Sequence, residues 1–327
     1  MGESTKLDIG ALGWLVNDFI LSLQVFLALP CLLFIVQFVH KAFSRFHQRS
    51  HIIESQILPG GVTRIVFPRP KSMGACKAGQ YVEITIHAIS HVEVHPFSLS
   101  GCPSDGILQL HIKDLGDWTH RLYELASENR LNGETIYVMG PFVTRAHQVM
   151  KYSNILLVSA GIGATPFVSI IENILKTDQS KKKRVHFHWL VNDQQAAKSW
   201  FPGLLQAVED YSGDQQIMAS VWYTGGRVFS SSTEKRLFEF SEKLFWDKNG
   251  RDFVMGIQKK NHRVEVNFGR PTWDDVLLEH TSGADEEPIG VFCCGPDGLT
   301  NSLGIACTEQ STLKKPINFH AEHFNSC

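Results

Sequence analysis

The sequence Ile155-Leu-Leu-Val-Ser-Ala-Gly-Ile-Gly-Ala-Thr-Pro166 decides the fold of this chain. Its apolar beginning indicates a buried strand, which ends in a turn at Gly161 and Gly163. Thr165 then suits a helix N-cap and Pro166 the first helical position. A strand, a glycine turn and a helix N-terminus can bind phosphate, because backbone N–H groups and the helix dipole face the anion. The alternative is an ordinary strand-to-helix turn, because Gly-x-Gly alone is a weak signal.

Composition narrows the class of protein. The chain has 327 residues, a formal net charge of −2 and 43% hydrophobic residues. This length fits two domains and a further segment, and the apolar content excludes wholesale disorder. Near-neutral charge gives no electrostatic case for a nucleic-acid partner. The seven cysteines form no Cys-x-x-Cys pair, so we expect no metal site of the zinc-ribbon type.

The N-terminal segment, residues 1–49, contains an uncharged apolar stretch at about 19–39. A stretch of about 20 such residues is long enough to span a bilayer. Asp18 precedes it, whereas the residues after it are basic: Lys41, Arg45 and Arg49. We therefore predict a transmembrane helix with the rest of the chain in the cytoplasm. Pro30 and two glutamines leave a buried or interfacial helix as the alternative.

Residues 50–149 have the pattern of a small β-barrel domain. Short alternating apolar runs are separated by turn residues, and one amphipathic helix is predicted at 118–126. Several short strands with one helix are typical of a barrel. The predicted strands are 51–58, 62–67, 81–86, 95–100, 107–112 and 135–139.

Residues 150–327 alternate between strands and helices, which predicts a doubly wound α/β domain with a mostly parallel sheet. The segment 225–270 is long, and a charged amphipathic helix is expected within it at about 233–245. The predicted strands are 155–159, 185–191, 217–223 and 289–294, and the predicted helices are 166–176, 194–208, 273–280 and 297–307.

A barrel followed by such an α/β domain resembles the ferredoxin–NADP reductase superfamily. From about residue 50 onward the chain resembles the dehydrogenase part of the NADPH oxidase and ferric reductase family. This resemblance implies an FAD-binding barrel and an NADPH-binding α/β domain. It rests on six motifs in order: His95-Pro-Phe-Ser-Leu-Ser100, His111-Ile-Lys-Asp-Leu-Gly-Asp-Trp-Thr119, Gly140-Pro-Phe142, Ala160-Gly-Ile-Gly-Ala-Thr-Pro-Phe167, Phe268-Gly-Arg-Pro-Thr-Trp-Asp274 and Cys294-Gly-Pro-Asp297.

The resemblance implies a flavin site in the barrel. The strand His95-Pro96-Phe97-Ser98 would lie along the isoalloxazine ring, with the Ser98 hydroxyl near N5 in a catalytic role. The start of the helix would bind the FAD pyrophosphate through backbone N–H groups and a hydroxyl. Lys113 replaces the commoner arginine and offers a point charge instead of a bidentate fork. The remaining FAD-binding residues implied are His111, Lys113, Gly116, Thr119 and Phe324, the last as a ring covering the flavin.

The resemblance also implies a nicotinamide site in the α/β domain. Cys294 would lie beside the nicotinamide C4 in a catalytic role, whereas Cys293 is expected to be a core residue. Members that prefer NADPH usually carry an arginine where Asn192 stands, so Arg270 alone, or Arg227 as the alternative, would bind the 2′-phosphate, and NADH stays possible. The implied nucleotide-binding residues are Gly161, Gly163, Thr165, Pro166, Thr224, Arg270, Cys294, Gly295 and Pro296.

The family's membrane part has several helices whose paired histidines bind haem, whereas the single span here contains no histidine. We therefore expect a membrane-tethered flavoprotein that passes electrons from NADPH through FAD to an acceptor, and that generates superoxide or hydrogen peroxide. The acceptor would be a haem-bearing partner, a full-length oxidase or a soluble molecule. One alternative is a non-catalytic nucleotide-binding regulator of a full-length oxidase. Another is a ferric-chelate or cytochrome b5-type reductase, although the latter usually has arginine at the position of His95.

Overall fold

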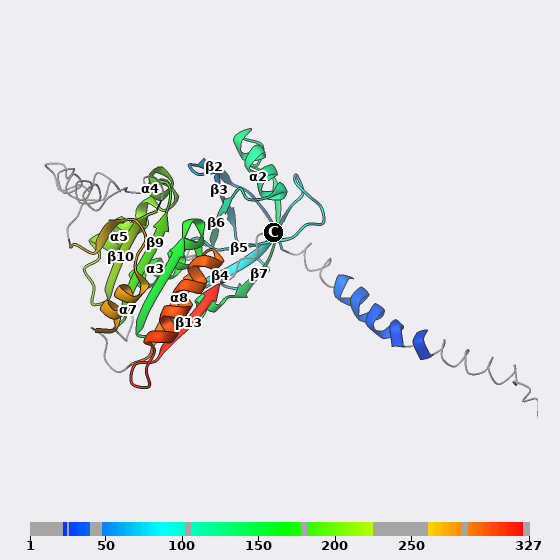
Figure 1. The fold of residues 1–327 in the computed structure, drawn as a ribbon. Helices are drawn as coiled ribbons and strands as arrows, with labels where there is room; N and C mark the ends of the chain where they lie inside the picture. The colour runs from blue at the N-terminus through cyan, green and yellow to red at the C-terminus, as the bar shows by residue number, and fades with distance from the viewer. Residues whose placement is uncertain are drawn as a thin grey trace, which may run out of the picture. The chain divides into compact units, whose positions relative to one another are not determined.

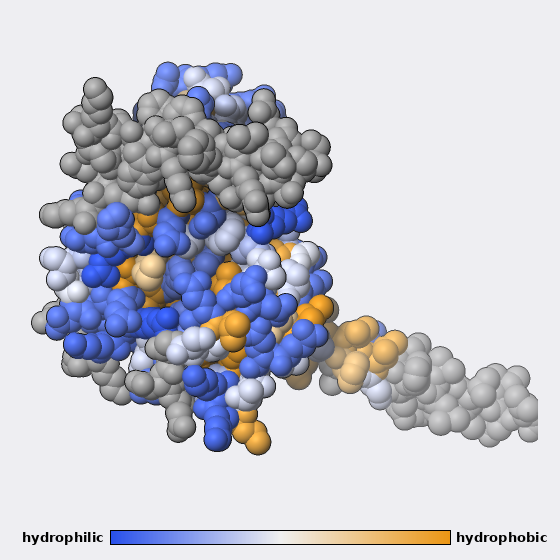
Figure 2. All heavy atoms as spheres, turned by 60° about the vertical axis from the view of Figure 1, so that its left-hand side comes forward, coloured by the Kyte–Doolittle hydropathy of each residue, from blue (hydrophilic) through white to orange (hydrophobic). Residues whose placement is uncertain are grey.

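The computed structural model divides the chain into an N-terminal unit, residues 1–48, and a main unit, residues 49–327. It describes residues 22–24, 26–39, 48–101, 106–177, 182–224, 261–282 and 287–322. The N-terminal unit contains the apolar helix Ser22–Val39, with a mean hydropathy of 2.2 over 18 residues. Its leucine and phenylalanine side chains are exposed and form an apolar surface (Figure 2). Its length and composition would allow it to cross a membrane.

The first part of the main unit consists of two antiparallel sheets, with the strand orders β1-β7-β4-β5 and β2-β3-β6 (Figure 1). Apolar side chains from both sheets form one core, which Trp118 and Leu122 of helix α2 close. The alternation predicted from sequence is seen in β4, where Val82, Ile84 and Ile86 are buried. The elements are β1 Arg49–His51, β2 Glu54–Leu58, β3 Val62–Pro68, β4 Gln80–Ile86, β5 His95–Ser98, β6 Ile107–Lys113, α2 Asp117–Ser127 and β7 Thr135–Val143.

The second part is a six-stranded parallel sheet of order β11-β10-β9-β8-β12-β13. Helices α3 and α5 share a core with one face, and α7 and α8 with the other. The elements are η1 Arg145–Lys151, β8 Asn154–Ala160, η2 Gly161–Ala164, α3 Thr165–Lys176, β9 Arg184–Val191, α4 Gln194–Trp200, α5 Pro202–Asp210, β10 Gln216–Tyr223, β11 Val264–Phe268, α7 Trp273–Ser282, β12 Ile289–Cys294, α8 Asp297–Gln310 and β13 Ile317–Glu322.

Strand β8 lies at the point where the strand order reverses. The chain leaves β8 for β9 on one side, and β12 later pairs with β8 on the other side. In parallel sheets, ligands bind at the carboxyl ends of the strands at such a switch point. The pairing of Ser159 with Cys294 places the glycine turn after β8 next to the loop after β12. The predicted fold, a β-barrel domain followed by a doubly wound α/β domain, is confirmed.

Two local predictions were wrong, two strands were missed, and one predicted helix is untested. The helix predicted at 194–208 is two helices, because Pro202 disfavours a helical conformation at Phe201, whose φ is −136° and ψ 61°. Strands β11 and β13 were not predicted. Thr165 is the first helical residue of α3, not its cap. The helix predicted at 233–245 lies outside the described residues.

Candidate dinucleotide and flavin site

The glycine turn is a short 3-10 helix, η2, inserted between β8 and α3. Gly161 has a φ of +54°, a left-handed conformation that favours glycine. A Cβ at Gly161 would meet no atom within 4 Å, so space is open beside the turn. The Gly161 carbonyl accepts a hydrogen bond of 2.9 Å from Trp189 Nε1, and this bond fixes the orientation of the peptide. The turn thus offers an open side at a helix N-terminus, where an anionic group can bind.

Gly163 packs directly on the loop after β12. A Cβ at Gly163 would lie 2.5 Å from the Cys294 carbonyl oxygen and 3.1 Å from Sγ, so no larger residue fits without movement. The two motifs, 131 positions apart in the sequence, therefore meet at one edge of the sheet. Burial raises the pKa of the Cys294 thiol well above its usual value, and the nearby Cys293 and Glu322 raise it further. The thiol is therefore neutral at physiological pH, which suits contact with an uncharged ring.

The outer strands carry two further predicted residues to the same sheet edge. Thr224 follows β10 and Arg270 follows β11, and the two strands pair through Tyr223 and Phe268. The Thr224 N–H and hydroxyl both donate to the Val191 carbonyl, at 2.8 and 3.2 Å. Arg270 is exposed. Both residues therefore lie at the carboxyl edge of the sheet.

The loop after β12 continues through Gly295 to Pro296, the N-cap residue of α8. A Cβ at Gly295 would lie 2.9 Å from Leu299 Cδ2 and 3.2 Å from the Ala160 Cβ at the end of β8. Glycine at this position thus allows the loop to lie close to β8. A second helix N-terminus therefore begins beside the glycine turn.

The flavin half of the site is built on β5. Phe97 stacks on Trp118 of α2 with ring centroids 5.8 Å apart, and His95 lies 4.5 Å from the same ring. His95 Nε2 is also 3.1 Å from Glu93 Oε2. The Ser98 hydroxyl is buried and, like Trp118 Nε1, has no hydrogen-bond partner among the residues that the structure describes. Buried polar groups normally have partners, so the free Ser98 hydroxyl fits a ligand such as a flavin ring.

The start of α2 has backbone N–H groups that can donate hydrogen bonds to an anion. Gly116 is the N-cap residue, and Thr119 Oγ1 accepts from the N–H groups of Leu115 and Gly116 at 2.9 Å each. The same hydroxyl donates to the Gly116 carbonyl at 2.9 Å. The Thr119 hydroxyl is therefore engaged in capping the helix. The backbone N–H groups of the first turn remain the donors for a phosphate.

His111 is buried and faces the second part of the main unit. Its Nδ1 lies 2.7 Å from Ser100 Oγ, and its ring contacts Phe201 at 4.8 Å between centroids. Burial, and to a smaller extent the nearby Arg64, lowers the pKa of His111 to about 3. His111 is therefore neutral and cannot attract a phosphate by charge. On this strand the cationic residue is Lys113, which is partly exposed.

The structure thus brings the two predicted halves together, because β6 contacts η2. Phe324 lies outside the described residues. Within the described part of the chain, no group of three or more His, Cys, Asp or Glu side chains could hold a metal ion.

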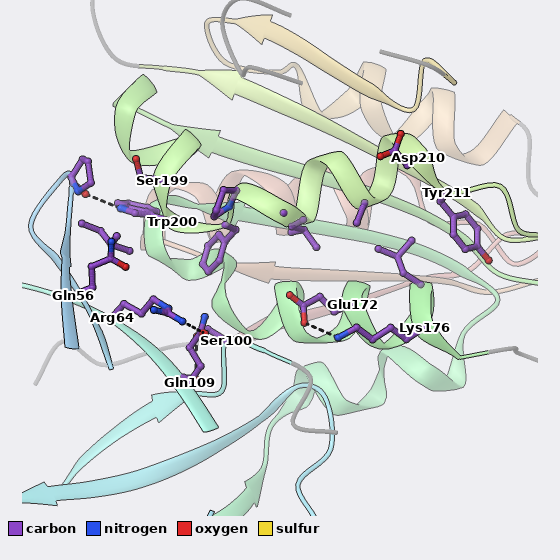
Figure 3. A pocket seen from close by; sticks show the side chains of 18 of the residues that line it. Gln56, Arg64, Ser100, Gln109, Glu172, Lys176, Ser199, Trp200, Asp210 and Tyr211 are labelled. Atoms are coloured by element: carbon purple, nitrogen blue, oxygen red, sulfur yellow. Dashed lines mark hydrogen bonds and ion pairs between the residues drawn. The ribbon is translucent and has the colours of Figure 1, made fainter. Parts of the chain in front are cut away.

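A cavity of about 970 Å³ lies between the β2-β3-β6 sheet and helices α3 and α5 (Figure 3). Ser100 and Gln109 line it on the barrel side, and Trp200 and Phe201 on the other side. Sequence reasoning missed both aromatic residues. The adjacent Trp-Phe before a proline at 200–202 was the available signal, since large apolar residues at a helix break are commonly buried.

Comparison with known proteins identifies the cofactor-binding domains. Residues 47–186 match an FAD-binding domain, and residues 152–308 match a ferric reductase NAD-binding domain. Residues 47–308 are therefore similar to the NADPH oxidase and ferric reductase family, with an FAD-binding domain followed by a ferric reductase NAD-binding domain. The predicted resemblance and the predicted FAD and nicotinamide cofactors are confirmed, whereas the individual binding residues described above stay predictions.

Two relatives illustrate the match. Respiratory burst oxidase homolog protein D from Solanum tuberosum is 29% identical over 336 residues, which covers 92% of this chain and 38% of that protein. NADPH oxidase 1 from Mus musculus is 30% identical over 256 residues, which covers 76% of this chain and 42% of that protein. The chain thus spans less than half the length of either relative.

Solved structures agree on the fold. The flavohemoglobin from Malassezia yamatoensis with bound FAD and heme superimposes with a TM-score of 0.55 at 18% identity, covering 84% of this chain and 59% of that one. The FAD/NAD-binding domain of nitric oxide dioxygenase from Vibrio cholerae gives a TM-score of 0.51 at 17% identity and covers 84% of this chain and 99% of that one.

Proposed function

We propose that the protein is a flavin-dependent dehydrogenase that takes a hydride from NADPH onto FAD and passes the electrons to an oxidase-type acceptor. The observation that carries this proposal is the packing of Gly163 on Cys294 at the switch point of the sheet, beside strand β6 of the barrel. A nicotinamide ring held at this edge faces the domain that carries the flavin-binding motif. The redox chemistry itself is supplied by the two cofactors.

The residues of the chain would bind the two cofactors and orient them toward each other. The open turn at Gly161 and the start of α3 would hold the dinucleotide phosphates, and the first turn of α2 would hold those of FAD. Cys294 would pack as a neutral thiol against the nicotinamide C4. The free Ser98 hydroxyl would hydrogen-bond near the flavin N5. Holding the two reacting atoms in contact in a site without water is the protein's main contribution to rate.

The preference for NADPH would rest on Arg270. Its guanidinium follows β11 at the sheet edge, whereas Asn192, after β9, carries no charge. A single arginine can form a charge-assisted pair with a 2′-phosphate. We therefore propose NADPH as the better donor and NADH as a weaker one. An Arg270→Gln variant should lose the difference between them.

The acceptor would lie at the membrane. The apolar helix Ser22–Val39 would tether the chain, with both cofactor-binding domains in the cytoplasm. The electrons would then pass to a haem-bearing partner or to oxygen, giving superoxide or hydrogen peroxide. Among these acceptors, a haem-bearing membrane partner suits a tethered dehydrogenase best.

The test is a measurement of flavin content and dye reduction in the purified full chain supplied with FAD. The proposal predicts bound flavin and NADPH-dependent reduction of an artificial dye. Loss of dye reduction in a Gly163→Val variant, with FAD still bound, would assign the activity to the nucleotide site. A chain that binds nucleotide but no FAD, and reduces no dye, would instead support a nucleotide-binding regulator.

A further inference from the structure

The aromatic residues Trp189, Trp200 and Phe201, here called the aromatic wedge, lie between the glycine turn and the barrel. All three side chains are buried. The ring of Trp189 lies 6.3 Å from that of Trp200 and 5.8 Å from that of Phe201, between centroids. Trp189 comes from β9, whereas the other two form the break between α4 and α5. The wedge therefore joins the parallel sheet to two helices.

One side of the wedge holds the dinucleotide turn. Trp189 Nε1 donates to the Gly161 carbonyl at 2.9 Å. Gly161 is the left-handed residue of the turn, so this bond fixes the peptide whose open side faces a ligand. Trp189 itself is fully buried in the sheet core, so its indole cannot shift without a rearrangement of its neighbours.

The other side of the wedge holds the barrel at two points. Trp200 Nε1 donates to the Pro59 carbonyl in the β2–β3 turn at 2.7 Å (Figure 3). Phe201 meets His111 of β6 edge-on, with centroids 4.8 Å apart. Because burial keeps His111 neutral, this contact is an apolar packing contact and not a cation–π pair. A continuous series of contacts thus runs from Gly161 through the wedge to β6.

The broken helix explains how Phe201 reaches this position. In one continuous helix from 194 to 208, the backbone of Phe201 would be helical and the helix axis would not change direction at this residue. Its non-helical φ of −136° and ψ of 61°, imposed before Pro202, instead end α4 at Trp200 and begin α5 in a new direction. Adjacent aromatic residues can then contact different parts of the barrel.

We propose that the aromatic wedge positions the nicotinamide turn against the barrel that carries the flavin strand, so that Trp189, Trp200 and Phe201 are positioning residues for hydride transfer. This proposal rests on the proposed dehydrogenase function. The rate of a transfer between two bound cofactors depends steeply on their separation, and a displacement of about 1 Å can cost roughly 100-fold. The wedge touches neither reacting atom in this account, so its loss should affect the transfer step more than binding of either cofactor.

The test compares Trp189→Phe with Trp222→Phe as a matched control. Both variants remove one indole donor from the same sheet: Trp222 Nε1 bonds to His188 on the face covered by α7, away from the wedge. The full chain, loaded with FAD, is mixed with NADPH under anaerobic conditions. Trp189→Phe should lower the limiting rate of flavin reduction about 10-fold or more and raise the deuterium isotope effect, with the NADPH dissociation constant changed less than threefold. Trp222→Phe should change the rate less than twofold.

A second readout does not need activity. Amide hydrogen exchange in the loaded protein should rise at residues 107–113 and 161–164 together in Trp189→Phe, and should stay unchanged there in Trp222→Phe. Equal rates in Trp189→Phe and the unchanged protein, or exchange that rises at 161–164 alone, would overturn the wedge proposal. If the unchanged protein binds FAD and NADPH without flavin reduction, the dehydrogenase function fails, and the exchange readout still decides whether the wedge couples the two parts.

Discussion

The buried carboxylate of Glu209 on α5 binds the backbone segment that leads into strand β11. Its replacement tests how much this contact stabilises the fold. Glu209 is fully buried. Its Oε1 accepts from the N–H groups of Asn261 and His262 at 2.7 Å, and its Oε2 from those of Arg263 and Val264 at 2.9 Å. These residues lead into β11, the strand that carries Arg270 to the sheet edge.

Glu209→Gln replaces one of the two oxygens with an amide nitrogen that can only donate. Two backbone N–H groups then lose their acceptor. Each hydrogen bond to a charged group contributes about 1.5–3 kcal/mol, so the free energy of unfolding should fall by roughly 3–6 kcal/mol. For a domain of this size the melting temperature should fall on the order of 10 °C.

The assay is thermal unfolding of the full chain by circular dichroism, together with amide hydrogen exchange at residues 261–264. Glu265→Gln is the matched control, because Glu265 is exposed on β11. Exchange at 261–264 should rise in Glu209→Gln only. A loss below about 1 kcal/mol in Glu209→Gln, or an equal loss in both variants, would refute the reasoning that these hydrogen bonds carry the energy.

Three further predictions concern the site and its support. Burial, and to a smaller extent the nearby Arg184, lowers the pKa of His186 to about 4 and that of His280 to about 3. Because these folded-state pKa values lie below the unfolded value, the folded protein is fully stable above pH 6.5 and loses stability as the pH falls. The free energy of unfolding should fall by about 2 kcal/mol per histidine at pH 5. Unchanged melting temperatures between pH 7 and 5 would contradict this prediction. Gly163→Ala should weaken NADPH binding at least 10-fold, measured by calorimetry, because its Cβ would lie 2.5 Å from the Cys294 carbonyl oxygen. Ser98→Ala should change the free energy of unfolding of the FAD-free protein by less than about 0.5 kcal/mol, since the hydroxyl has no hydrogen-bond partner among the described residues. The same variant should slow flavin reduction in stopped-flow traces. A rate equal to that of the unchanged protein would show that Ser98 is not part of the site.

The architecture was predictable because short sequence patterns, such as apolar runs and glycine turns, mark its strands and helices. The run from Ile155 to Ser159 is apolar on both faces, as a central parallel strand requires, and the glycines mark where it ends. The sequence placed the glycine turn and the Cys294 loop at the same edge of the sheet, whereas their contact came from the structure. Strands β11 and β13 were missed because both are edge strands with polar side chains, so neither shows a buried run.

The details of the site needed three-dimensional information. The sequence assigns His111 a place near phosphate, but only the packing of Phe201 against it shows that the imidazole is buried and neutral. The capping bonds of Thr119 likewise depend on backbone geometry at Leu115 and Gly116. Glu209 and Trp189 have no motif at all, because their partners are backbone groups distant in sequence.

The central claim is that NADPH bound at the sheet edge reduces FAD bound in the barrel. The most direct measurement is the absorbance of the bound flavin after anaerobic mixing of the FAD-loaded full chain with NADPH, and separately with NADH. The account predicts that NADPH bleaches the flavin and that NADH does so more slowly. A flavin that stays oxidised with both nucleotides, although FAD and nucleotide are shown to bind, would contradict it.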